Sequence, residues 1–204
     1  MLTAAEALRR LADGNRRFVA GESLNPGAAA CPADTAAGQR PFAVILGCSD
    51  SRVPAEIVFD QGLGDLFVIR IAGNIVAPSQ IGSVEFAVTS YGTPLVMVLG
   101  HSGCGAVLAT VDQLQGPAEA RSRNLATIVN FVRPSVRAAR AACPDADHDA
   151  LVARAVRENI RRSVEHLRHG SDIIEDLVSG GQLEIVGAEY SLETGEVELL
   201  GDKE

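Results

Sequence analysis

The sequence PLVMVLGHSGCG, residues 94–105, decides the fold that we expect for this chain of 204 residues. Residues 95–99 are apolar without alternation, which is typical of a strand that is covered on both faces in a largely parallel sheet. Residues 42–46 and 66–69 share this pattern, and residues 183–188 form a fourth, interrupted apolar run. We therefore predict an α/β fold with a mostly parallel central sheet.

Helices must cover both faces of such a sheet, and four segments have the composition or the spacing of flanking helices. In the clearest of them Val152, Val156 and Ile160 recur at helical spacing, and we expect Gly170 to end that helix. The four helices are predicted at residues 81–91, 104–115, 125–142 and 147–169.

The two ends of the chain complete the predicted architecture. Residues 3–18 predict an amphipathic N-terminal helical arm, with Thr3 and Glu6 at the spacing of a capping box. Residues 21–40 are rich in Gly, Ala and Pro, so we expect an extended connection there. Residues 182–200 predict a hairpin with a Glu-Thr-Gly turn, which adds an antiparallel edge strand.

Length and composition indicate the number of domains and exclude some classes of partner. We expect a single domain over residues 1–204, with the arm and connection in residues 1–40 and the catalytic α/β core in residues 41–204. The net charge of −8 and the lack of a long basic run argue against nucleic acid as a partner. No apolar run approaches the roughly 18 residues that cross a bilayer, and the first ten residues lack the apolar core of an export signal. We expect a cytoplasmic protein without a membrane partner.

Two candidate metal ligands directly follow predicted strands. Cys48 comes after Leu-Gly at the end of the first apolar run, and His101 comes after Leu-Gly at the end of the third. Because the carboxyl ends of parallel strands lie on one edge of a sheet, these residues can meet there. Cys104 follows three residues after His101 and can reach the same ion. Zn2+ accepts two thiolates and an imidazole and keeps a fourth position open, so we predict one catalytic zinc per chain.

A charged pair follows the first ligand, in Cys48-Ser49-Asp50-Ser51-Arg52. Zinc with two thiolates and a neutral imidazole is a neutral centre, which acidifies bound water less than an all-histidine site, where the pKa of that water is about 7. Unless Asp50 and Arg52 assist, we expect a higher pKa for the water and an activity that falls below mildly alkaline pH. A flat pH profile would contradict this expectation.

Each of these residues also has a plainer interpretation. The three ligand candidates could be metal-free core residues, and Asp50 with Arg52 could be an exposed ion pair of little energetic value. Their convergence on two strand ends favours the metal site. Cys31 and Cys143 each precede a proline, and we expect both to be idle thiols that do not bind zinc.

With these motifs the chain resembles the β-carbonic anhydrases. The Cys-x-Asp-Ser-Arg motif at residues 48–52 and the His-x-x-Cys motif at residues 101–104 carry the resemblance, which extends over residues 1–200. Further similar features are Gln39-x-Pro41, Val53-x-x-Glu56, Gly64-Asp65-Leu66-Phe67-Val68-x-Arg70, Ala72-Gly73-Asn74, Ser83-x-Glu85 and Gly105-Ala106.

The resemblance implies a carbonic anhydrase, a zinc lyase that hydrates carbon dioxide reversibly to bicarbonate and a proton through a zinc-bound hydroxide. It implies Cys48, His101 and Cys104 as zinc ligands. Asp50 would accept a hydrogen bond from water in the fourth position and be fixed by Arg52, or would itself be the fourth ligand in a closed resting form. Self-association into dimers or tetramers is also implied, with the N-terminal helix embracing a neighbour.

A substrate pocket is implied as well, with Gln39 as a hydrogen-bond donor and with Phe67 and Ala72 on an apolar wall beside the zinc. Such a wall suits an uncharged linear substrate. The chain departs from the family at Phe86, where many plant-like members have Tyr, and at Ile71, where Asn is common. A regulatory bicarbonate site of some bacterial members uses a Trp, and this chain has none.

Two rival functions stay open. Related enzymes with this site hydrolyse carbon disulfide or carbonyl sulfide, and a structural or sensory zinc module would use the metal only to hold its fold. A thiol redox function is disfavoured, because the chain has no Cys-x-x-Cys pair. Assays with all three gases separate the two enzymes. The variant Asp50→Ala separates an enzyme from a zinc module, because only an enzyme would lose turnover while keeping its zinc.

Overall fold

A five-stranded sheet forms the centre of the molecule in the computed structural model, which describes residues 2–24, 36, 38–115 and 122–201. The strand order is β2-β1-β3-β4-β5, in which the first four strands are parallel and β5 is antiparallel to β4. The predicted parallel sheet with an antiparallel edge is therefore confirmed. The strands are β1 (Ala43–Gly47), β2 (Leu66–Arg70), β3 (Leu95–His101), β4 (Glu184–Tyr190) and β5 (Val197–Leu200).

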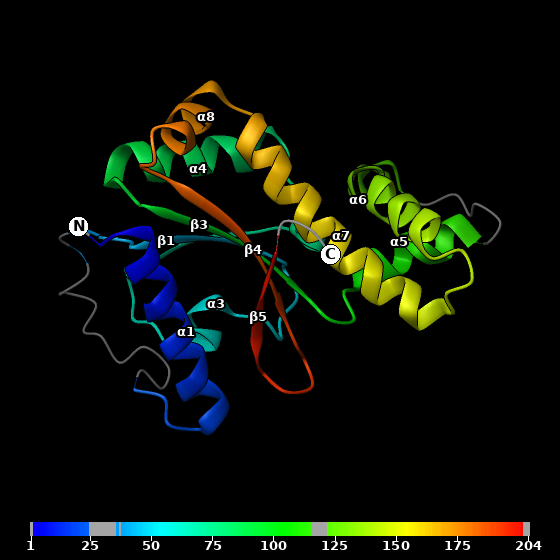
Figure 1. The fold of residues 1–204 in the computed structure, drawn as a ribbon, viewed down its shortest axis with the longest axis horizontal. Coiled ribbons are helices and arrows are strands. Elements are labelled where there is room, and N and C mark those ends of the chain that lie inside the picture. Colours follow the sequence, from blue (N-terminus) through cyan, green and yellow to red (C-terminus); the bar gives the residue numbers. More distant parts are fainter. Residues whose placement is uncertain (1, 25–35, 37, 116–121, 202–204) are drawn as a thin grey trace.

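Helices cover both faces of this sheet, with α4, α7 and α8 on one side and α1 and α3 on the other (Figure 1). The arm and the four flanking helices are present close to their predicted bounds. The helical elements are α1 (Ala4–Ala20), α3 (Ala55–Val58), η1 (Ala72–Asn74), α4 (Pro78–Tyr91), α5 (Gly105–Gln115), α6 (Arg123–Ala142), α7 (His148–His169) and α8 (Asp172–Ser179).

Every residue of β1 and β3 is buried, which explains their continuous apolar sequence. Alternate side chains point to opposite faces of a strand. Val44 and Leu46 accordingly join the core beneath α4, α6 and α7, whereas Ala43 and Ile45 join the core beneath α1. The two cores fix β1 and β3 firmly, and the ends of these strands are rigid positions for functional side chains.

The predicted caps and turns are mostly found. Thr3 and Glu6 form the capping box of α1. The hairpin from β4 to β5 turns with Gly195 at φ 77°, a left-handed conformation that favours glycine. The first of the four flanking helices, α4, starts three residues earlier than predicted, with Pro78 in its first turn, where a proline loses no hydrogen bond.

Three short elements, α3, η1 and α8, were not predicted, because four, three and eight residues are too few to show a clear helical period. None of the described helices combines the length and the hydropathy that a bilayer-spanning helix needs.

Candidate metal centre

The centre lies where the strand order of the sheet reverses. From β1 the chain passes to β2 on one side of β1 and then to β3 on the other, so β1 and β3 are neighbours whose carboxyl ends lie together. Open α/β sheets bind ligands at this position. Gly47, the last residue of β1, pairs with Leu99 of β3. Cys48 directly follows Gly47, and His101 is the last residue of β3, so both side chains lie at this edge. Cys104 immediately precedes α5, and its carbonyl accepts the first helical hydrogen bond from Leu108 at 2.9 Å.

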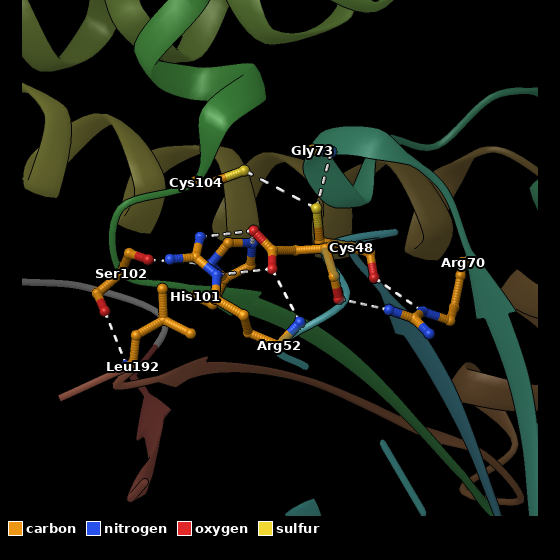
Figure 2. Close-up of polar contacts among 9 residues, drawn as sticks. Cys48, Arg52, Arg70, Gly73, His101, Ser102, Cys104 and Leu192 are labelled. Atoms are coloured by element: carbon orange, nitrogen blue, oxygen red, sulfur yellow. Dashed lines mark hydrogen bonds and ion pairs between the residues drawn. The ribbon is translucent and has the colours of Figure 1, made fainter. Parts of the chain in front are cut away.

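The three predicted ligands converge, as Figure 2 shows. The Sγ atoms of Cys48 and Cys104 are 4.0 Å apart, and the ligand atoms of both residues and His101 all lie within 4.8 Å of one another. A tetrahedral zinc with Zn–S bonds of about 2.3 Å holds two sulfurs about 3.8 Å apart. The sulfur separation therefore fits a shared zinc, and it is about twice the length of a disulfide bond.

The orientation of the His101 ring supports a metal in the same place. His101 is fully buried, and its Nδ1 lies 2.9 Å from the carbonyl oxygen of Ser102, which can only accept a hydrogen bond. Nδ1 therefore carries the proton, and Nε2 presents its lone pair. Nε2 is buried and has no hydrogen-bond partner among the described residues. A metal ion would satisfy this nitrogen, and the Ser102 carbonyl would hold the ring for it.

The two thiols share one hydrogen bond. This bond, together with contacts from His101 and from the backbone N–H of Gly73, lowers the pKa of Cys48 to about 4 against the opposing effect of burial. The same bond, together with burial, raises the pKa of Cys104. The thiolate form is therefore favoured at Cys48, and a bound dication would favour the thiolate form of Cys104 as well.

Asp50 and Arg52 form a bidentate ion pair beside the three predicted ligands. The Nε and Nη2 atoms of Arg52 donate to the two carboxylate oxygens at 2.9 and 2.7 Å, which holds the pKa of Asp50 well below its usual range. The Asp50 side chain is only 17% exposed, and its Oδ2 lies 3.9 Å from Nε2 of His101. The Asp50 carboxylate therefore lies beside the predicted ligands, while the Arg52 side chain is 58% exposed.

Arg70 and Ser102 hold the ligand loops, which sequence reasoning did not anticipate. Arg70, at the end of β2, donates to the carbonyls of Cys48 and Asp50 at 3.0 and 2.5 Å. Ser102 Oγ accepts a hydrogen bond from the N–H of Leu192 at 3.0 Å, which joins the loop after His101 to the hairpin (Figure 2). Both residues lie inside the quoted motifs, but their backbone partners cannot be recognised from the sequence.

The residues predicted to bind substrate divide between the two ends of the sheet. Ala72 opens η1, beside Gly73 and the Cys48 sulfur. Gln39 precedes β1 and donates to the Tyr91 hydroxyl at 2.9 Å. The five residues of β1 alone separate Gln39 from Cys48 by roughly 16 Å, at about 3.3 Å per residue.

Phe67 lies toward the amino end of the parallel strands, as Gln39 does, because Phe67 pairs with Val44 in the first half of β1. Its ring is 6.2 Å from the rings of Phe86 and Tyr91. Within one chain, the structure therefore brings Ala72 to the metal centre and places Gln39 and Phe67 in a separate aromatic cluster.

Cys143 is not part of the centre. Cys143 caps the end of α6 and is partly exposed. Cys31 lies outside the described residues. Within the described ranges, Cys48, His101 and Cys104 are the only group of His, Cys and acidic residues placed to share a metal.

Comparison with known proteins gives a consistent result. The family model described as carbonic anhydrase matches residues 43–197. The carbonic anhydrase of Mycolicibacterium smegmatis is 42% identical over 200 residues, covering 96% of this chain and 94% of the relative. Carbonic anhydrase 2 of Mycobacterium tuberculosis is 41% identical over 194 residues, covering 95% and 91%.

Solved structures show the same similarity. The Coccomyxa β-carbonic anhydrase in complex with acetazolamide has a TM-score of 0.74 at 26% identity, covering 96% of this chain and 84% of that one. A tetrameric β-carbonic anhydrase from Sordaria macrospora has a TM-score of 0.72 at 26% identity, covering 83% and 85%.

Proposed function

We propose that this chain, which belongs to the β-carbonic anhydrase family and is a carbonic anhydrase, interconverts carbon dioxide and bicarbonate at a zinc ion held by Cys48, His101 and Cys104. The observation that carries this proposal is the buried Cys-His-Cys group, in which Nε2 of His101 has no hydrogen-bond partner among the described residues. Two thiolates and an imidazole are a ligand set that suits zinc and leaves one position for the reaction.

Zinc bound there would supply a Lewis acid that makes a water molecule nucleophilic near neutral pH. The chain's own residues would orient that water. Asp50 stays ionised because Arg52 holds it, so its carboxylate can accept a hydrogen bond from the water at the fourth position. Both carboxylate oxygens are already paired with Arg52, which supports water and not Asp50 as the fourth ligand.

For the substrate we propose a pocket formed by Gln39, Phe67 and Ala72. Because Gln39 and Phe67 lie away from the metal ligands of their own chain, this pocket requires a second copy that presents these two residues to the neighbouring centre. We therefore propose an assembly built from dimers, either alone or paired into tetramers. The tetrameric relative from Sordaria macrospora supports such an assembly.

The test is an assay of the purified zinc protein with carbon dioxide, carbonyl sulfide and carbon disulfide. We expect rapid hydration of carbon dioxide and one zinc per chain. Negligible turnover of carbon dioxide together with turnover of either sulfur compound would overturn the proposal in favour of the related hydrolase. A protein that holds zinc but turns over none of the three would be a non-catalytic zinc module.

A further inference from the structure

The buried face of α7 carries two polar side chains on an otherwise apolar surface. Asn159 and Ser163 lie one helical turn apart and are 2% and 5% exposed, among Val156, Ile160 and Val164. Burying a polar side chain costs free energy unless the side chain is hydrogen-bonded. Both side chains donate to backbone carbonyls of η1, the turn that contacts the metal centre.

The backbone of η1 needs support from outside the turn. Gly73 has φ 72° and Asn74 has φ 41°, both in the left-handed region that a residue other than glycine seldom adopts. A Cβ on Gly73 would lie 3.1 Å from Ala106 Cβ and 3.3 Å from Val132 Cγ2, so the turn is also packed tightly. Nδ2 of Asn74 has no partner among the described residues, so this nitrogen does not hold the turn.

Three hydrogen bonds connect α7 to the Cys48 sulfur through this turn. Nδ2 of Asn159 donates to the Gly73 carbonyl at 2.7 Å, and Oγ of Ser163 donates to the Asn74 carbonyl at 3.0 Å. The N–H of Gly73 donates to Sγ of Cys48 at 3.4 Å (Figure 2). The two side chains of α7 thus fix the two carbonyls that follow the amide on the sulfur.

We propose that Asn159 and Ser163 are positioning residues that hold the Gly73 amide on the Cys48 sulfur and thereby limit how strongly this thiolate donates electrons to the metal. An N–H that donates to a thiolate withdraws electron density from it, and residues behind a metal ligand tune the metal in this way. The inference rests on the proposed function, because it requires a metal at the centre.

The test replaces zinc by Co2+ and records the sulfur-to-cobalt charge-transfer absorption. The variant Asn159→Leu removes the donor to Gly73 at similar side-chain size, and Ser163→Ala removes the donor to Asn74. Without the amide on the sulfur the thiolate is easier to oxidise, so we expect the band to move to longer wavelength in both variants, more in Asn159→Leu. Because Asn159→Leu also loosens the turn that holds Cys48 in position, we expect this variant to bind Co2+ about tenfold more weakly.

A matched control is Val152→Ala on the same buried face of α7, about 10 Å from Asn159 at 1.5 Å per residue. This variant should unfold at a lower temperature than the wild type and keep the band position. A shift of the same size in Val152→Ala would overturn the inference, because general loosening of α7 would then explain it.

The outcomes separate the inference from the proposed function. A wild-type protein without sulfur-to-cobalt bands would refute both. A wild type with these bands and an unchanged band in the variants would refute only the role of Asn159 and Ser163. If Asn159→Leu does not fold, Ser163→Ala decides alone, and an unshifted band in that variant would overturn the inference.

Discussion

The two ends of the sheet are built in different ways. At the carboxyl end the proposed metal ligands are buried. Arg70 donates to the Cys48 carbonyl and the N–H of Gly73 donates to the Cys48 sulfur, while the Ser102 carbonyl accepts a hydrogen bond from the His101 ring. At the amino end the cluster of Phe67, Phe86 and Tyr91 lies at the surface, and Phe86 is 53% exposed. One chain thus provides all three proposed metal ligands at the carboxyl end. Of the residues that we assign to the substrate, Ala72 lies beside these ligands, whereas the exposed Gln39 and the partly buried Phe67 lie at the amino end.

This difference indicates which parts of the proposed active site come from one chain and which come from a neighbouring copy. A metal centre needs ligand positions accurate to a fraction of an ångström, which two fully buried neighbouring strands provide. An apolar pocket wall needs only surface of the right character in the right place. The second requirement can be met by a neighbouring copy.

The largest effect is expected from loss of a ligand at the carboxyl end. His101→Ala removes the only imidazole of the centre, so we expect the zinc content to fall far below one per chain and the hydration of carbon dioxide to fall to that of buffer. Zinc analysis and a carbon dioxide assay measure this. Cys143→Ala, which lies outside the centre, is the control and should keep both. A His101→Ala protein that retains one zinc would refute the ligand assignment.

The next largest effect is expected at Asp50, which orients the water and does not hold the metal in the proposed state. Asp50→Ala should lower kcat by roughly a hundredfold or more, in the range typical for a lost acid–base group. Its zinc content should equal that of the wild type. Asp149→Ala, which removes an exposed carboxylate, is the control. Loss of zinc from Asp50→Ala would instead support Asp50 as the fourth ligand.

A smaller effect is expected at the amino end. Gln39→Ala removes one hydrogen-bond donor, so kcat/KM should fall about fivefold, the equivalent of about 1 kcal/mol. The zinc content should not change, because Gln39 is distant from the ligands of its own chain.

Mixed assemblies of Gln39→Ala chains with Asp50→Ala chains show which copy Gln39 serves. If Gln39 serves the neighbouring centre, the centre with an intact Asp50 receives an intact Gln39 and should have wild-type kcat/KM. If that centre retains the fivefold defect of Gln39→Ala, the role of a second copy in the pocket is wrong.

The smallest effect is expected far from the metal ligands, at His148. Hydrogen bonds to Asp112 at 3.0 Å and to Asp149 at 3.2 Å raise the pKa of this exposed imidazole. A raised folded-state pKa stabilises the protein below the unfolded pKa of about 6.5, and the gain is lost as the pH rises through the folded value.

His148→Gln should therefore have a lower Tm than the wild type at about pH 5 and an equal Tm at about pH 9. Thermal unfolding at the two pH values measures this. Activity should not change, because the residue touches neither the metal ligands nor the predicted pocket. A Tm difference that is the same at both pH values would show that the charge of His148 is not its cause.

The sequence by itself determined the sheet, the flanking helices and the ligand set. Strands buried on both faces need continuous apolar runs, and the residues that follow two such runs must meet at one edge of a parallel sheet. Cys48 and His101 could be predicted on this ground, Cys104 could be added because it follows three residues after His101, and the chemistry of the three side chains then indicated zinc. Asp50 and Arg52 could be paired because they are two residues apart.

Only the tertiary structure decided what surrounds these ligands. Asn159 and Ser163 interact with carbonyls 86 and 89 residues away, and the sequence does not show which backbone carbonyl a side chain will reach. The free Nε2 of His101 depends on a hydrogen bond to the next residue's carbonyl, which the ring orientation sets. The separation of Gln39 from the centre depends on which end of β1 it occupies. Local composition determines which elements form, whereas contacts between distant backbone groups depend on how these elements pack.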